Sequence, residues 1–245
     1  MRLALSTWPE IEAYLQRSDG VIVPAGSTEQ HGPIGLIGTD TLCAATIAEE
    51  AAALADALVI PPFAYTPAPF NMSFPGTLSI SADSFVSLFG DVVDGLLHHG
   101  FRHIYILNGH GANVEPVGRA LAGREGCFRL RNWWDFDSVN ALRHKWYGGW
   151  EGMHATPSEI AITQARYRVV GGGDLPPPQK LSQDYIRAHA GDRHGPPEEH
   201  RKRFPDGRVG AHSALARPDQ GKRLLEVASR AVADDYRAFL AAASG

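Results

Sequence analysis

The chain has 245 residues, enough to bury a large core in one domain. Its net charge of -4 and scattered charged residues argue against a protein that binds nucleic acid or a membrane surface. Two cysteines are too few for a disulfide framework, and no apolar segment suits a secretion signal or a bilayer span, so we expect a soluble, cytoplasmic protein.

Helix and strand patterns alternate along the chain. Ser6 or Thr7 can cap a first helix to about Arg17, with Pro9 and Glu10 favoured in its first turn. The elements expected after it are strand 21–25, helix 40–57, strand 58–60, helix 82–99, strand 103–107, helix 113–124, strand 127–130, helix 158–167 and a final helix 218–240. Repeated crossovers of this kind predict an α/β fold with a mainly parallel sheet.

The segment from about residue 171 to 210 differs in composition from the rest. It begins with a glycine break at 171–173 and is rich in Pro, Gly and charge, which excludes sheet core. We interpret it as a long ordered loop or a subunit-contact arm of a single domain spanning residues 1–245. His194, His200 and His212 have no further ligand at short spacing, so we interpret them as solvated loop residues.

Candidate metal ligands gather after two of the expected strands. Glu29, His31 and Asp40 follow the first strand, and His110 follows the third. A lone carboxylate or histidine in a loop is usually solvated or hydrogen-bonded structure. Four of them at the carboxyl ends of two strands, where parallel sheets bind ligands, favour a metal site. Mixed carboxylate and imidazole ligands suit zinc, manganese or iron.

Four ordered motifs resemble the creatininase (creatinine amidohydrolase) family. They are Pro24-Ala-Gly-Ser-Thr-Glu-Gln-His-Gly-Pro33 with Asp40, Phe74-Pro-Gly-Thr77, Asn108-Gly-His-Gly-Ala-Asn113 and His154-Ala-Thr-Pro-Ser-Glu159. The likeness runs in order from about residue 7 to residue 230. It implies an αβα sandwich, a two-metal amidohydrolase and assembly as a homohexamer.

The resemblance also implies two ligand sets. Glu29, Asp40 and His110 would hold one divalent ion. His31, Asp40 and Glu159 would hold the other, so that Asp40 bridges the two. We expect zinc first, with manganese or iron as alternatives.

Glu159 needs a separate argument. In creatininase a glutamate two residues after the histidine that corresponds to His110 is a ligand, and here that residue is Ala112. Family members with a small residue there use the glutamate of a His-x4-Glu motif, whose spacing His154 and Glu159 keep. The alternative is a surface charge that compensates the helix dipole.

The expected mechanism uses water as the nucleophile. Two divalent ions lower the pKa of a shared water from about 15.7 toward about 7, which gives a metal-bridging hydroxide. This hydroxide would attack the carbonyl of an amide or formamide, and His154 would act as proton shuttle to the departing nitrogen. Ser27 lies in no Gly-x-Ser-x-Gly elbow, so we interpret it as turn structure.

Substrate choice depends on residues around the expected site. Trp134 and Trp150 fall near places where creatininase presents aromatic residues to its substrate; the alternative is ordinary core or interface packing, which explains Trp134 equally well. Ser73, Met153 and Ile34 stand where family members carry polar or charged residues. We therefore expect a small cyclic amide or formamide other than creatinine.

Two further functions stay open. A peptidase of the same family, which trims a short peptide such as a cofactor precursor, would use the same ligands. A non-catalytic metal-binding protein would be expected to lack a ligand or His154, and none is missing here.

Overall fold

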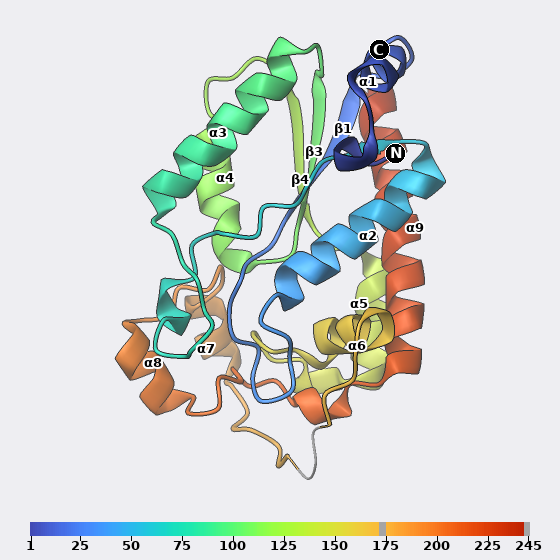
Figure 1. Ribbon diagram of the computed structural model, residues 1–245. Coiled ribbons are helices and arrows are strands. Elements are labelled where there is room, and N and C mark those ends of the chain that lie inside the picture. The colour runs from blue at the N-terminus through green and yellow to red at the C-terminus, as the bar shows by residue number, and fades with distance from the viewer. Residues whose placement is uncertain (172–174, 243–245) are drawn as a thin grey trace.

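Four parallel strands form the central sheet of the protein, which we describe from a computed structural model of residues 1–171 and 175–242 (Figure 1). The strands are β1 (Gly20–Ala25), β2 (Leu58–Val59), β3 (His103–Asn108) and β4 (Cys127–Asn132). Their order is β2-β1-β3-β4, and every pairing is parallel. The predicted mainly parallel sheet is confirmed.

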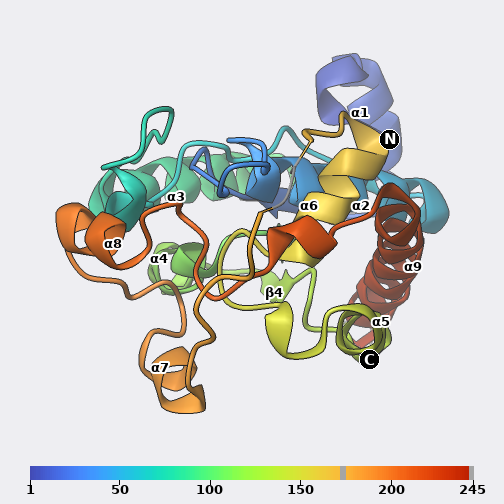
Figure 2. The ribbon, with the colours of Figure 1, turned by 90° about the horizontal axis from the view of Figure 1, so that it is seen from below.

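Helices cover both faces of this sheet (Figures 1 and 2). One layer consists of α2 (Thr39–Ala55), α5 (Asp137–Trp146), α6 (Pro157–Arg166) and α9 (Pro218–Ala242). The other consists of α1 (Trp8–Leu15), α3 (Ala82–His98) and α4 (Val114–Leu121). The αβα sandwich is confirmed. In the described part of the chain, no helix combines the length and apolar character needed to cross a bilayer.

Side chains of the buried strands alternate between the two layers. Val21 and Val23 of β1 pack in the apolar cluster beneath α3, whereas Ile22 packs in the cluster beneath α2 and α9. Ile104 and Tyr105 of β3 divide in the same way. The two-residue period of a strand explains this division, and burial on both faces explains why these strands are continuous apolar runs in the sequence. The single-domain organisation stays a prediction.

The predicted helices agree with the observed ones to within a few residues, whereas α5 and two short helices within residues 171–210 were not predicted. Val139, Leu142 and Trp146 of α5 stand at i, i+3 and i+7 and pack against the core, but Val139 alone is fully buried, so the apolar stripe of α5 is short and weak. Asp137 in its first turn and three basic residues in its last turn were further signals of a helix.

The segment from 171 to 210 contains two short helices, α7 (Gln183–Ala188) and α8 (Pro197–Arg203), so it is more than a loop. Residues 172–174, within the predicted glycine break, lie outside the described residues. The interpretation of His194 and His200 as solvated is wrong. The side chain of His194 is 1% exposed, and the ring of His200 packs edge-on against Phe70 at 5.1 Å, because α8 folds back onto residues 69–71.

Candidate metal centre

The strands β1 and β3 end side by side, and the candidate ligands begin there. Ala25 pairs with Asn108 at the carboxyl ends of the two strands. The chain leaves β1 through α2 on one face of the sheet and reaches β3 through α3 on the other. The ends of β1 and β3 therefore flank the switch point at which open α/β sheets bind ligands.

Two glycines let α2 begin directly against these strand ends. A Cβ on Gly26 would lie 2.2 Å from the backbone nitrogen of Thr41, and one on Gly109 would lie 2.4 Å from the carbonyl oxygen of Asp40. Asp40, in the first turn of α2, thereby enters the space between the strands. The buried Ser27 hydroxyl donates to Asp40 Oδ2 at 2.8 Å, so Ser27 orients a candidate ligand in addition to shaping the turn.

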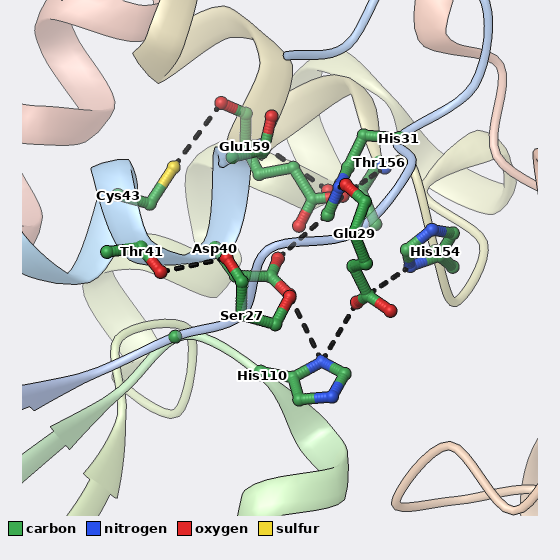
Figure 3. A network of polar contacts seen from close by, with 12 residues as sticks. Ser27, Glu29, His31, Asp40, Thr41, Cys43, His110, His154, Thr156 and Glu159 are labelled. Carbon is green, nitrogen blue, oxygen red and sulfur yellow. Dashed lines mark hydrogen bonds and ion pairs between the residues drawn. The ribbon is translucent and has the colours of Figure 1, made fainter. Parts of the chain in front are cut away.

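The predicted ligands form one buried cluster (Figure 3). His31 Nε2 lies 2.8 Å from Asp40 Oδ1. His110 Nδ1 lies 3.0 Å from Glu29 Oε1 and 3.1 Å from Asp40 Oδ2. The ligand atoms of Glu29, Asp40 and His110 are all within 4.8 Å of one another, and so are those of His31, Asp40 and Glu159. The structure thus groups the five residues into the two predicted sets, with Asp40 common to both.

Backbone carbonyls orient both histidines. His31 Nδ1 lies 3.1 Å from the carbonyl oxygen of Glu29, and His110 Nε2 lies 2.8 Å from that of Pro67. A ring N–H that donates to a carbonyl leaves the other ring nitrogen as an acceptor, which is the usual arrangement of a metal-binding histidine. In both residues that second nitrogen faces the carboxylates.

Glu159 serves its helix and the cluster at once. The backbone N–H of Thr156 donates to Glu159 Oε1 at 2.5 Å, and the N–H of Glu159 donates to Thr156 Oγ1 at 3.3 Å, which completes a capping box at the start of α6. Glu159 Oε1 also lies 3.8 Å from His31 Nε2. Because Glu159 is only 7% exposed, the alternative of a surface charge fails.

Burial and mutual attraction shift the ionisation of the cluster. Burial opposes a charge on His31, yet Asp40, Glu159 and Glu29 outweigh it and raise the pKa of His31 to about 10. The pKa of His110 rises well above its usual value against the same burial, with Glu29 as the strongest partner. Burial raises the pKa of Glu159 to about 8. The charged forms of the three acidic side chains, Glu29, Asp40 and Glu159, therefore need a positive charge between them to be stable.

Divalent cations fit this requirement. Glu29 Oε1 is buried and accepts no hydrogen bond from the described residues, although His110 Nδ1 is 3.0 Å away. A carboxylate oxygen in that state has a lone pair to offer to a cation. The combination of carboxylate oxygens and imidazole nitrogens is a donor set that binds zinc, manganese and iron.

His154 lies beside the cluster. Its Nε2 is 2.6 Å from the carbonyl oxygen of Gln30, and its Nδ1 is 3.8 Å from Glu29 Oε1. Burial, followed by the positive charge of His31, lowers the pKa of His154 to about 3, far from the unperturbed value of about 6.5. The ring is therefore neutral near pH 7. Glu29, His31 and His154 form a third trio of potential ligands within 4.8 Å.

A cavity of ≈ 190 Å³ opens over the cluster. Asp40, His110, His154 and Glu159 line it from the cluster side. Its other lining residues include Trp134, Arg143, Met153 and Asp192. The cluster is thus open to a small molecule.

The predicted substrate-binding residues divide into two groups. Trp134 and Met153 line the cavity, whereas Trp150 and Ser73 are not among its lining residues. Trp150 packs edge-on against His212 at 5.6 Å. The carbonyl of Ser73 accepts a hydrogen bond from Arg201.

Three residues of the site were not identified from the sequence. Asn71 Nδ2 donates to Glu29 Oε2 at 2.8 Å, which holds that carboxylate in place. Arg143 and Asp192 enter the cavity wall from α5 and from the loop between α7 and α8. Asn71 lies three residues before Phe74, where the predicted Phe74 to Thr77 motif begins, and that proximity was the only signal for it.

Comparison with known proteins shows relatives that act on different molecules. The chain is 35% identical over 113 residues to 3-dehydro-scyllo-inosose hydrolase of Thermotoga maritima, an alignment that covers 45% of this chain and 36% of that one. It is 27% identical to creatinine amidohydrolase of Pseudomonas putida, with 94% of each chain covered. It is 41% identical over 108 residues to mycofactocin precursor peptide peptidase of Mycolicibacterium smegmatis, with 42% and 43% covered. The chain thus spans less than half of the first and third relatives.

Solved creatininases share the fold. A crystal structure of creatinine amidohydrolase matches with a TM-score of 0.76 at 24% identity, covering 98% of this chain and 97% of that one. A Zn-Zn form of a mutant creatininase and a manganese form match with TM-scores of 0.76 and 0.75, each at 23% identity and with 98% of both chains covered. The creatininase (creatinine amidohydrolase) family model matches residues 4–235. The chain therefore belongs to the creatininase family of amidohydrolases.

Proposed function

We propose that the protein is a dinuclear metal-dependent hydrolase that cleaves the C–N bond of a small cyclic amide or formamide. The observation that carries this proposal is the sharing of buried Asp40 between two trios of potential ligands. Glu29, Asp40 and His110 would hold one cation, and His31, Asp40 and Glu159 the other. The Zn-Zn and manganese forms of related creatininases favour zinc or manganese.

The cations, when bound, would supply Lewis-acid polarisation of the carbonyl and acidify the attacking water. The chain itself would move the proton. When the Nε2–H of neutral His154 donates to the carbonyl of Gln30, Nδ1 is left as an acceptor that would take a proton from the attacking water. Nε2 is held by the carbonyl of Gln30 at 2.6 Å, which fixes the ring while Nδ1 passes the proton to the departing nitrogen.

The cavity supports a small substrate. Its ≈ 190 Å³ is below the roughly 300–1,000 Å³ of pockets for drug-sized ligands. Trp134 offers an aromatic face in the cavity wall that suits a flat amide or ring. These two features favour a compact cyclic amide or formamide over a long chain.

A substrate panel tests this proposal. Protein loaded with Zn²⁺ or Mn²⁺ is assayed on cyclic amides, formamides and short peptides, and His154→Gln is the matched inactive control. We expect turnover of at least one cyclic amide or formamide and none by the control. Absence of turnover across the panel in protein that binds two cations would support the non-catalytic metal-binding function instead.

A peptidase is the second candidate, because one relative with 41% identity is a mycofactocin precursor peptide peptidase. Such a protein would use the same cluster on a peptide carbonyl. The same panel separates the two functions, since the peptidase would cleave short peptides and leave cyclic amides and formamides intact.

We also propose that the chain assembles as a homohexamer in the cytoplasm, with the segment 171–210 as a subunit contact. This proposal follows from the family resemblance and from the composition of that segment. Size-exclusion chromatography with light scattering is expected to give six chains per particle, and a monomer would contradict it.

A further inference from the structure

The loop between α7 and α8 brings a carboxylate to the cavity. In Figure 1 both helices lie beyond the carboxyl end of the sheet, on the side of α3 and α4. Asp192 in this loop lines the cavity, and its side chain is only 12% exposed. Its φ of 55° lies in the left-handed region, which is uncommon outside glycine and occurs where the surroundings impose it.

Backbone atoms after β3 hold this carboxylate. The N–H of Ala112 donates to Asp192 Oδ2 at 3.1 Å. A Cβ on Gly111 would lie 2.5 Å from the same oxygen, so only glycine at 111 leaves space for it. The carboxylate of Asp192 is therefore bound to the backbone that directly follows His110, although Asp192 and His110 lie far apart in the sequence.

Among the described residues, no Arg or Lys forms an ion pair with Asp192. Its ion-pair partners within 4.0 Å in the described part of the chain are two histidines: His110 Nδ1 lies 3.8 Å from Oδ2, and His194 Nε2 lies 3.7 Å from Oδ1. His194 Nε2 is itself buried and without a hydrogen bond among the described residues. A buried carboxylate is costly unless a positive charge compensates it.

We propose that Asp192 is a positioning residue of the metal centre, which faces the cation held by Glu29, Asp40 and His110 from the cavity side. This inference rests on the proposed function. The trios of potential ligands in the described chain do not include Asp192, so its carboxylate would act through its charge beside His110 and through hydrogen bonds to a water or a substrate N–H. The loop between α7 and α8 thereby becomes part of the site.

Titration of the metal-stripped protein with Mn²⁺, followed by calorimetry, tests this role. Asp192→Asn keeps an oxygen that can accept from Ala112 and removes the charge. Its matched control is Asp184→Asn on α7, where an exposed carboxylate pairs with Arg187. We expect Asp192→Asn to bind one of the two ions about 10- to 100-fold more weakly, which is the usual loss when a residue that supports a metal ligand is removed. The control is expected to bind both ions as the wild type does. Asp192→Glu, which keeps the charge, is expected to recover most of the affinity.

Each other outcome has a defined meaning. Wild-type affinity for both ions in Asp192→Asn would overturn the inference and leave the metal centre intact. A lower Tm of the stripped Asp192→Asn protein with unchanged affinity would reduce Asp192 to a structural contact and overturn it too. A wild-type protein that binds neither Mn²⁺ nor Zn²⁺ would remove the proposed function along with it.

Discussion

Asp40→Asn tests whether one carboxylate serves two metal sites. Asparagine keeps the shape of the side chain and an acceptor for the Ser27 hydroxyl. It removes the charge that faces His31 Nε2 at 2.8 Å and His110 Nδ1 at 3.1 Å. Because each trio loses its shared ligand, we expect the variant to bind neither cation tightly.

The cost in stability follows from the same contacts. Hydrogen bonds to a charged group contribute roughly 1.5–3 kcal/mol each, so loss of both costs on the order of 3–6 kcal/mol in the metal-stripped protein. For a chain of this size each kcal/mol lowers Tm by about 2–4 °C, which predicts a fall on the order of 10 °C. The fold survives that loss if the wild type has ordinary stability.

The assay combines metal analysis with thermal unfolding. Asp235→Asn is the matched control, because Asp235 is also largely buried and pairs with Arg129 at 3.0 Å, but it lies on α9 outside the cluster. The control should lose stability and keep both cations. Two cations per chain in folded Asp40→Asn, bound with wild-type affinity, would refute the shared-ligand reasoning.

Three further predictions concern protons, turnover and packing. Below its pKa of about 10, His31 must release a proton to bind a cation, so affinity should rise with pH, and calorimetry in buffers of different ionisation enthalpy should detect the released proton; no proton release would contradict it. His154→Gln should keep both cations and lose roughly 10²- to 10⁴-fold in turnover, and unchanged turnover would exclude the proton shuttle. Gly26→Ala should cost about 1–3 kcal/mol in denaturant unfolding and weaken metal binding, because its Cβ would meet Thr41 at 2.2 Å and displace α2; wild-type stability would contradict this packing.

The sheet and most of the cluster were predictable because local sequence determines them. The runs that contain Ile22 and Tyr105 are buried on both faces, so continuous apolar segments marked β1 and β3. Glu29 and His110 follow those strands directly, and the switch-point rule brings their ends together.

The rest depends on contacts between distant segments. Asp192 reaches Ala112 across 80 positions, and Asn71 reaches Glu29 across 42, so no local pattern identifies either one. The low pKa of His154 arises from burial and from the ring of His31 at 4.4 Å, and neither follows from its place in the His-x4-Glu motif. Packing, rather than residue type, sets these properties.

The metal content of protein purified without an affinity tag, compared between the wild type and Glu159→Ala by elemental analysis, tests the dinuclear centre most directly. We predict about two divalent ions per chain in the wild type and about one in the variant, because Glu159 belongs to only one of the two predicted ligand sets. No bound metal after Zn²⁺ or Mn²⁺ is offered, or two ions retained by Glu159→Ala, would contradict it.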